Sequence, residues 1–134
     1  MDSLDIGRYS RQICLPQVGE RGQERLTRSR VLVAGCGGLG SVLAFYLAAA
    51  GVGRIILVDR DRVEPSNLNR QILYQEAHLG QSKAKTAAST LKALNSGIRV
   101  IPVADRLTRR LLAPLSGRRT WRWTGPTPLT PGRS

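Results

Sequence analysis

The sequence predicts an α/β fold in which helices flank a parallel β-sheet. Three observations support this prediction. Residues 31–34 and 54–58 are short apolar runs typical of buried strands, and residues 41–50 between them are apolar at a helical spacing. A Gly-rich turn joins the first strand to that helix. A strand, a helix and a second strand within about thirty residues favour a right-handed parallel crossover.

The remaining elements follow in chain order. Short helices are expected over residues 8–13 and 22–29, before the first strand. The helix at 41–50 is apolar almost all round, as buried helices are, and Gly51 and Gly53 end it. Residues 61–72 are expected to form a polar loop that turns helical near Leu68. A second long helix has Ser82 as its cap and ends at residues 95–97. Its apolar stripe consists of Ala84, Ala87, Ala88, Leu91 and Leu94. A third strand at 99–103 contains Pro102, which favours a sheet edge. This succession is Rossmann-like.

The Gly-rich turn predicts an anion site. Its glycines let the backbone turn tightly and approach a ligand, and the following helix points unpaired N–H groups at the turn. The glycines are Gly35, Gly37, Gly38 and Gly40. Asp59 follows the second strand, where an acidic side chain accepts hydrogen bonds from ribose hydroxyls. Two alternatives stay open: a turn that only packs the helix close to the strand, and an aspartate that is only solvated.

Length and composition limit the number of domains and the cellular compartments that are expected. The chain has 134 residues, enough for one domain, and no apolar run of membrane-spanning length. Residues 1–7 lack the apolar core of a secretory signal. Cys14 and Cys36 are expected to be free thiols in a reducing compartment, and we expect a cytoplasmic protein. His78 is expected to be structural or solvated.

The net charge of +12 is concentrated near the C-terminus. Residues 106–134 carry seven arginines and no acid, whereas residues 1–105 carry fourteen Lys and Arg against nine Asp and Glu. Residues 113–134 are rich in Pro, Arg and Trp and are expected to be a disordered tail. Nucleic-acid binding rests on this tail alone and is the least favoured interpretation.

Five stretches, in this order, carry a resemblance to a known family: residues 8–12, 35–40, 50–61, 66–71 and 80–83. Together they resemble the ubiquitin-activating-enzyme-like, ThiF-type adenylyltransferases. Their sequences are most similar to the eukaryotic branch that acts in molybdenum-cofactor synthesis and tRNA thiolation. The resemblance covers roughly residues 5–105, and it makes residues 5–112 the nucleotide-binding domain.

The resemblance implies ATP- and Mg²⁺-dependent adenylylation of the C-terminal glycine of a ubiquitin-like or sulfur-carrier protein. It implies that the four glycines and the stretch Ser66, Asn67, Leu68, Asn69 and Arg70 bind the nucleotide, with Asp59 on the ribose. Arg70 and Lys83 would contact the phosphates and act in catalysis. Arg11 would reach the nucleotide of a second subunit, which implies a homodimer, or a heterodimer with a full-length relative.

The sequence also departs from the family pattern. The aspartate that binds Mg²⁺ in the family, its two Cys-x-x-Cys zinc pairs and its downstream catalytic cysteine have no counterpart here. The pattern is that of the N-terminal half of a catalytic domain, with an exposed sheet edge beyond the third strand. No metal ligand is therefore assigned, and activity of this chain alone stays open. Two other classes remain: an NAD(P)-binding oxidoreductase fragment and a non-catalytic nucleotide-binding or interaction fragment.

Overall fold

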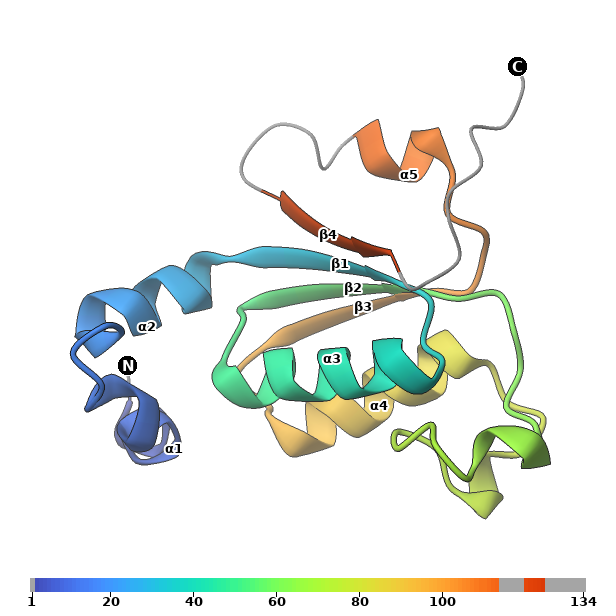
Figure 1. The fold of residues 1–134 in the computed structure, drawn as a ribbon, viewed down its shortest axis with the longest axis horizontal. Coiled ribbons are helices and arrows are strands. Elements are labelled where there is room, and N and C mark those ends of the chain that lie inside the picture. The colour runs from blue at the N-terminus through green and yellow to red at the C-terminus, as the bar shows by residue number, and fades with distance from the viewer. Residues whose placement is uncertain (1, 114–119, 125–134) are drawn as a thin grey trace.

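A computed structural model describes residues 2–113 and 120–124. Figure 1 shows a sheet with α3 and α4 on one side and α5 on the other. The elements are α1 (Ser3–Ile13), α2 (Gly19–Arg28), β1 (Arg30–Ala34), α3 (Gly38–Ala50), β2 (Arg54–Val58), η1 (Pro65–Asn67), η2 (Glu76–His78), α4 (Lys83–Leu94), β3 (Arg99–Val103), α5 (Arg109–Leu112) and β4 (Thr120–Thr124).

The sheet has the strand order β3-β2-β1-β4, and every pair is parallel. Each strand is five residues long and rich in β-branched or other apolar side chains. Side chains alternate between the two faces of a strand. One set faces α3 and α4 in the hydrophobic core: Val31, Val33, Ile55, Leu57 and Val100. The prediction that Pro102 marks an edge is confirmed, since β3 is an outer strand.

Helix α3 packs closely on the sheet because its inner face is small. Ala44 and Ala48 have no exposed surface. The helix ends at Gly51, which has the left-handed φ of 88° that favours glycine. A Cβ at Gly51 would lie 2.6 Å from the ring of Tyr9, so a side chain there would also clash. The short helix–strand connection places β2 directly beside β1.

The N-terminal helices are tied to this body by buried amide groups. Asn95 is fully buried, and its Nδ2 donates to the Tyr9 hydroxyl and to the Ala48 carbonyl, both at 2.8 Å. Gln12 Nε2 donates to the Ala50 carbonyl at 2.7 Å and also to Gln23. α1 is therefore fastened to α3 and α4 by hydrogen bonds as well as by the Tyr9 ring.

Several predicted elements begin earlier than expected. α1 begins at Ser3, not residue 8, because Asp2 caps it through a 2.8 Å bond from the Asp5 N–H. α2 and α3 each begin three residues before the predicted starts at 22 and 41, and the first strand begins one residue before residue 31. The predicted helical turn near Leu68 is η1, which ends one residue before it.

The expectation of a structureless tail from residue 113 onward is wrong for residues 120–124. These residues form β4, which pairs with β1 in the register Arg30↔Thr120 to Ala34↔Thr124. The sheet therefore has four strands, and the edge of β1 is covered. Residues 114–119 and 125–134 of the predicted tail lie outside the described residues. None of the helices in residues 2–113 is both long and apolar enough to cross a bilayer.

Candidate functional site

The Gly-rich turn lies at the carboxyl end of β1 and leads directly into α3. Gly35 has a φ of 90°, and its N–H donates to the Val58 carbonyl at 2.8 Å. A Cβ at Gly40 would lie only 1.9 Å from the Gly35 carbonyl oxygen. Gly37 caps α3 without a side-chain hydrogen bond. The turn is thus closed tightly on itself, and the N–H groups at the start of α3 are left for a ligand.

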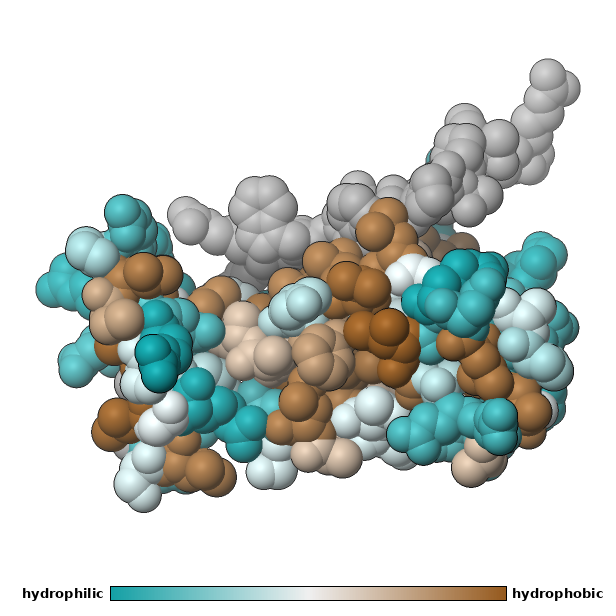
Figure 2. All heavy atoms as spheres, turned by 60° about the horizontal axis from the view of Figure 1, so that its bottom comes forward, coloured by the Kyte–Doolittle hydropathy of each residue, from teal (hydrophilic) through white to brown (hydrophobic). Residues whose placement is uncertain are grey.

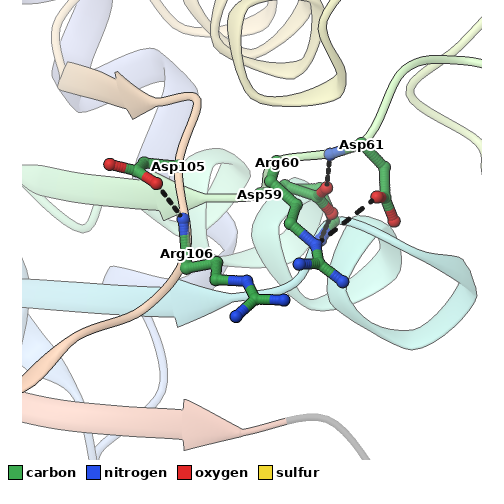
Figure 3. A network of polar contacts seen from close by, with 6 residues as sticks. Asp59, Arg60, Asp61, Asp105 and Arg106 are labelled. Atoms are coloured by element: carbon green, nitrogen blue, oxygen red, sulfur yellow. Dashed lines mark hydrogen bonds and ion pairs between the residues drawn. The ribbon is translucent and has the colours of Figure 1, made fainter.

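Asp59 joins the end of β2 to this turn. Its Oδ2 accepts the Cys36 N–H at 2.8 Å, and its Oδ1 accepts the Asp61 N–H at 2.7 Å. Figure 3 shows Asp59 with Arg60, Asp61, Asp105 and Arg106 around the carboxyl ends of the strands. Arg60 Nε lies 3.9 Å from Asp61 Oδ1. The carboxylate of Asp59 is therefore held rigidly beside the turn, with one lone pair on each oxygen used by the backbone.

Arg70 lies directly over Gly38. A Cβ placed on Gly38 would be 3.4 Å from Arg70 Cγ and 3.6 Å from Arg70 Nε. Arg70 Nη1 donates to the Ser66 carbonyl at 2.9 Å and to Asn69 Oδ1 at 3.0 Å. The side chain is exposed, and these two bonds hold its guanidinium beside the start of α3.

The other residues of the predicted stretch shape the loop. Asn67 is buried, and its Oδ1 accepts the Glu64 N–H at 2.8 Å within η1. Leu68 packs against the hydrophobic core. Ser66 and Asn69 are exposed and bond Arg70. Asn67 and Leu68 thus hold the loop in place, and Ser66 and Asn69 hold Arg70.

Lys83 is the first residue of α4 and is buried, with 6% of its surface exposed. Its N–H donates to the Asp61 carbonyl at 3.0 Å. Within residues 2–113 and 120–124 its ammonium group forms neither a hydrogen bond nor an ion pair. The charge of Lys83 lies close enough to Cys36 to lower the pKa of that thiol. Burial and the charge of Asp59 outweigh this effect and raise the Cys36 pKa to about 12. The charges of Lys83 and Asp59 thus both lie near the turn, and the side chain of Lys83 is mostly buried.

Two residues of the site were not predicted from the sequence. Tyr74 is buried, and its hydroxyl donates to the Cys36 carbonyl at 2.7 Å. This bond holds the Gly-rich turn in place. Burial raises the Tyr74 pKa, which keeps this donor protonated. Gln71 is 3% exposed, and its Oε1 has no hydrogen-bond partner among the described residues. Its Nε2 lies 3.8 Å from a Cβ placed on Gly37. Gln71 is the last residue of the stretch 66–71 that carries the family resemblance, so that stretch could have indicated it.

Arg11 lies apart from the other predicted site residues. It is exposed on α1, and Figure 1 shows α1 at the opposite end of the molecule from the carboxyl ends of the strands. The remaining predicted residues gather around the turn within one chain.

The residues present fit a nucleotide better than they fit a metal ion. The turn has uncapped N–H groups, and Arg70 and Lys83 supply positive charge, as a polyphosphate requires. The unpartnered Oε1 of Gln71 leaves room for a hydrogen-bond donor. By contrast, residues 2–113 and 120–124 contain no group of three or more His, Cys, Asp or Glu that could hold a metal ion.

Comparison with known proteins gives the same family from sequence and from structure. The model of the ThiF family matches residues 9–119. The "Adenylyltransferase and sulfurtransferase MOCS3" of Bos taurus is 58% identical over 78% of this chain. The "Sulfur carrier protein adenylyltransferase" of Thermus thermophilus is 53% identical over 78% of it. The chain spans 23% of the length of the first relative and 38% of the second.

Solved structures agree. Escherichia coli tRNA N6-threonylcarbamoyladenosine dehydratase, TcdA, in complex with AMP, has a TM-score of 0.77 and 31% identity, covering 85% of this chain and 46% of that one. E. coli MccB with ATP has a TM-score of 0.71 and 32% identity, covering 84% and 35%. Two of these similar structures were thus solved with adenine nucleotides. Together with the geometry of the Gly-rich turn, these matches establish that the chain belongs to the ThiF family.

Proposed function

We propose that this chain binds ATP at the Gly-rich turn and acts in adenylylation of the C-terminal glycine of a ubiquitin-like or sulfur-carrier protein. One observation supports the proposal most strongly: two cationic side chains lie at the same turn. Arg70 lies over Gly38, and the mostly buried Lys83 lies near Cys36. The names of the relatives support the reaction, since two of them are adenylyltransferases.

In this proposal each residue has a physical role. The N–H groups at the start of α3 bind phosphate oxygens, and Asp59 accepts hydrogen bonds from the ribose hydroxyls with its remaining lone pairs. Arg70 and Lys83 offset the negative charge of the triphosphate. Gln71 and Tyr74 hold the turn and the loop at a fixed separation. Lys83 is mostly buried, so its side chain has few alternative positions from which to reach a phosphate.

The reaction joins two anions. A carboxylate oxygen of the carrier's C-terminal glycine attacks the α-phosphorus, a P–O bond to the β-phosphate breaks, and pyrophosphate leaves with the electron pair. Positive groups fixed where charge accumulates lower the barrier. In this proposal Arg70 and Lys83 are those groups. Mg²⁺ belongs to the reaction implied by the family, but no step is assigned to it, because the described residues hold no acidic cluster for it.

We further propose that the chain acts as a dimer and that Arg11 serves the nucleotide of the second subunit. Its distance from the turn of its own chain supports this assignment. α3 also carries exposed Leu39 and Tyr46, and Figure 2 shows apolar side chains gathered over the middle of the face on which α3 lies. A heterodimer with a longer relative would use the same surfaces. A cytoplasmic location is proposed with this function.

Calorimetric titration of the purified chain with ATP, AMP and NAD⁺ tests nucleotide binding. ATP is expected to bind, and Lys83→Ala is expected to weaken it at least tenfold, about 1.4 kcal/mol. Lys85→Ala is the matched control, since Lys85 is exposed on the same helix. Tighter binding of NAD⁺ than of ATP would favour an oxidoreductase fragment instead.

Exchange of labelled pyrophosphate into ATP, with a carrier protein ending in glycine, then tests turnover separately. Exchange that depends on Arg70 supports an adenylyltransferase. ATP binding without exchange, also in a mixture with a full-length relative, would reduce the proposal to a non-catalytic nucleotide-binding chain.

A further inference from the structure

On the sheet face opposite α3 and α4, the residues that the structure describes cover β2 and β3 incompletely. Leu32, Ile56 and Ile101 alternate with the core residues of their strands and therefore face this side. Leu32 is fully buried, whereas Ile56 and Ile101, on β2 and β3, are only half-buried. Among the described residues, the four-residue helix α5 is the helix on this side (Figure 1). Parallel sheets normally have helices on both faces, so this face has the character of a docking surface.

A row of arginines borders the same face at the amino ends of the strands. Arg30 is in register with Arg54, and Arg54 is in register with Arg99. Residues in register on adjacent strands point to the same face, about 4.8 Å apart. The row lies two residues before Leu32, Ile56 and Ile101, so it shares their face.

The arginine row has no carboxylate partner in the part of the chain that the structure describes, where the ion pair is Arg60–Asp61. Arg30 and Arg99 are exposed, and Arg54 is half-buried. Like charges placed directly opposite one another destabilise a sheet. A binding partner that brings negative charge to this row would relieve that repulsion.

We propose that this face docks an amphipathic helix of a partner protein, with acidic residues in the last turn of that helix against Arg30, Arg54 and Arg99. Helices that cover a parallel sheet run opposite to its strands, so the C-terminus of the docked helix would lie over the amino ends of the strands. The negative end of the helix dipole then adds to the acidic side chains. An apolar stripe on the helix would cover Ile56 and Ile101.

Charge and chemistry favour this occupant over two others. A second copy of the chain carries the same net charge of +12 and the same arginine row. An RNA backbone would satisfy the arginines but has no apolar surface for Ile56 and Ile101. The acidic amphipathic helix matches both parts of the face.

The test uses fluorescent synthetic helices of about 18 residues, ~27 Å long, with a leucine stripe. The first has three glutamates in its last turn. The second has the same composition with the glutamates in its first turn. The full chain is expected to bind the first at least tenfold more tightly, measured by anisotropy. Equal affinity for both peptides would overturn the proposed orientation.

Variants of the chain complete the test. Arg54→Gln is expected to weaken binding of the first peptide at least fivefold, and Ile101→Asp at least as much, with circular dichroism checking the fold. Lys92→Gln is the matched control, because Lys92 is exposed in the last turn of α4, on the other face of the sheet. An unchanged affinity in Arg54→Gln would overturn the proposal. So would an RNA oligonucleotide that binds more tightly than the peptide with the same dependence on Arg54.

Discussion

Gly40 and Gly37 differ sharply in what surrounds them, although both belong to the Gly-rich turn. A Cβ at Gly40 would lie 1.9 Å from the Gly35 carbonyl oxygen, whereas at Gly37 the nearest atom is Gln71 Nε2 at 3.8 Å. We expect Gly40→Ala to lower the free energy of unfolding by more than about 3 kcal/mol and Gly37→Ala by less than about 1 kcal/mol. Urea unfolding of both variants measures the difference. Similar losses would mean that the turn is less tightly closed.

Cys36 makes stability depend on alkaline pH. Burial raises its pKa from 9.0 in a solvated thiol to about 12 in the folded chain. Below pH 9 the thiol is protonated in the folded and in the unfolded state, so its full contribution to the free energy of unfolding is present. Between pH 9 and 12 the unfolded thiol loses its proton and the folded one keeps it, so stability falls.

We expect the free energy of unfolding to drop by about 2 kcal/mol from this group between pH 8 and pH 10.5. Urea titrations at the two pH values check this, with Cys36→Ala as the comparison. The variant is expected to show a smaller pH dependence, although it is less stable throughout. An equally steep fall in Cys36→Ala would assign the effect to other groups.

Residue by residue, the sequence predicted the parts of the site that follow strands and turns. The glycines, Asp59, Arg70 and Lys83 lie near one another because the carboxyl ends of parallel strands share one edge. Tyr74 was not predicted, since a tyrosine 38 residues after Cys36 has no local pattern that indicates a bond to it. The assigned nucleotide contacts, including that of Arg11, stay predictions.

At the scale of elements, one of the groups that hold α1 in place is the buried amide of Asn95, directly after α4. Asn95 donates to Tyr9 and Ala48 and accepts the Gly97 N–H at 3.1 Å. Asn95→Ala removes the bonds to the Tyr9 hydroxyl and the Ala48 carbonyl and leaves the Gly97 N–H without its side-chain acceptor, and we expect a loss of about 2–3 kcal/mol. Tyr9→Phe removes one of these bonds and is expected to cost about 1 kcal/mol. Thermal unfolding of both variants compares them. Equal losses would show that the amide acts only through Tyr9.

Element boundaries were predicted best where apolar runs end at polar residues or glycine. The strands at 54–58 and 99–103 match β2 and β3 to the residue. The start of α3 was missed because its first residues, Gly38 and Gly40, have low helix propensity, and tertiary packing overrides it. β4 was missed because residues 120–124 form a strand by pairing with β1, and the composition of this segment does not indicate a strand.

At the scale of the whole molecule, β4 protects the edge of β1. Shortening the chain after Ala113 removes β4 and leaves the N–H and C=O groups of one side of β1 unpaired. We expect a lower urea midpoint and concentration-dependent association, measured by light scattering. An unchanged midpoint would mean that the β1–β4 ladder adds little to stability.

The register between Arg30 and Thr120 also has a consequence for the time at which the fold is completed. On the ribosome, the segment from β1 to β2 emerges early, and its contacts are close in sequence, so α3 and the turn can assemble at once. The partner strand of β1 is made ninety residues later. A nascent chain therefore carries the folded Gly-rich turn on a sheet in which one edge of β1 stays open until residues 120–124 have emerged.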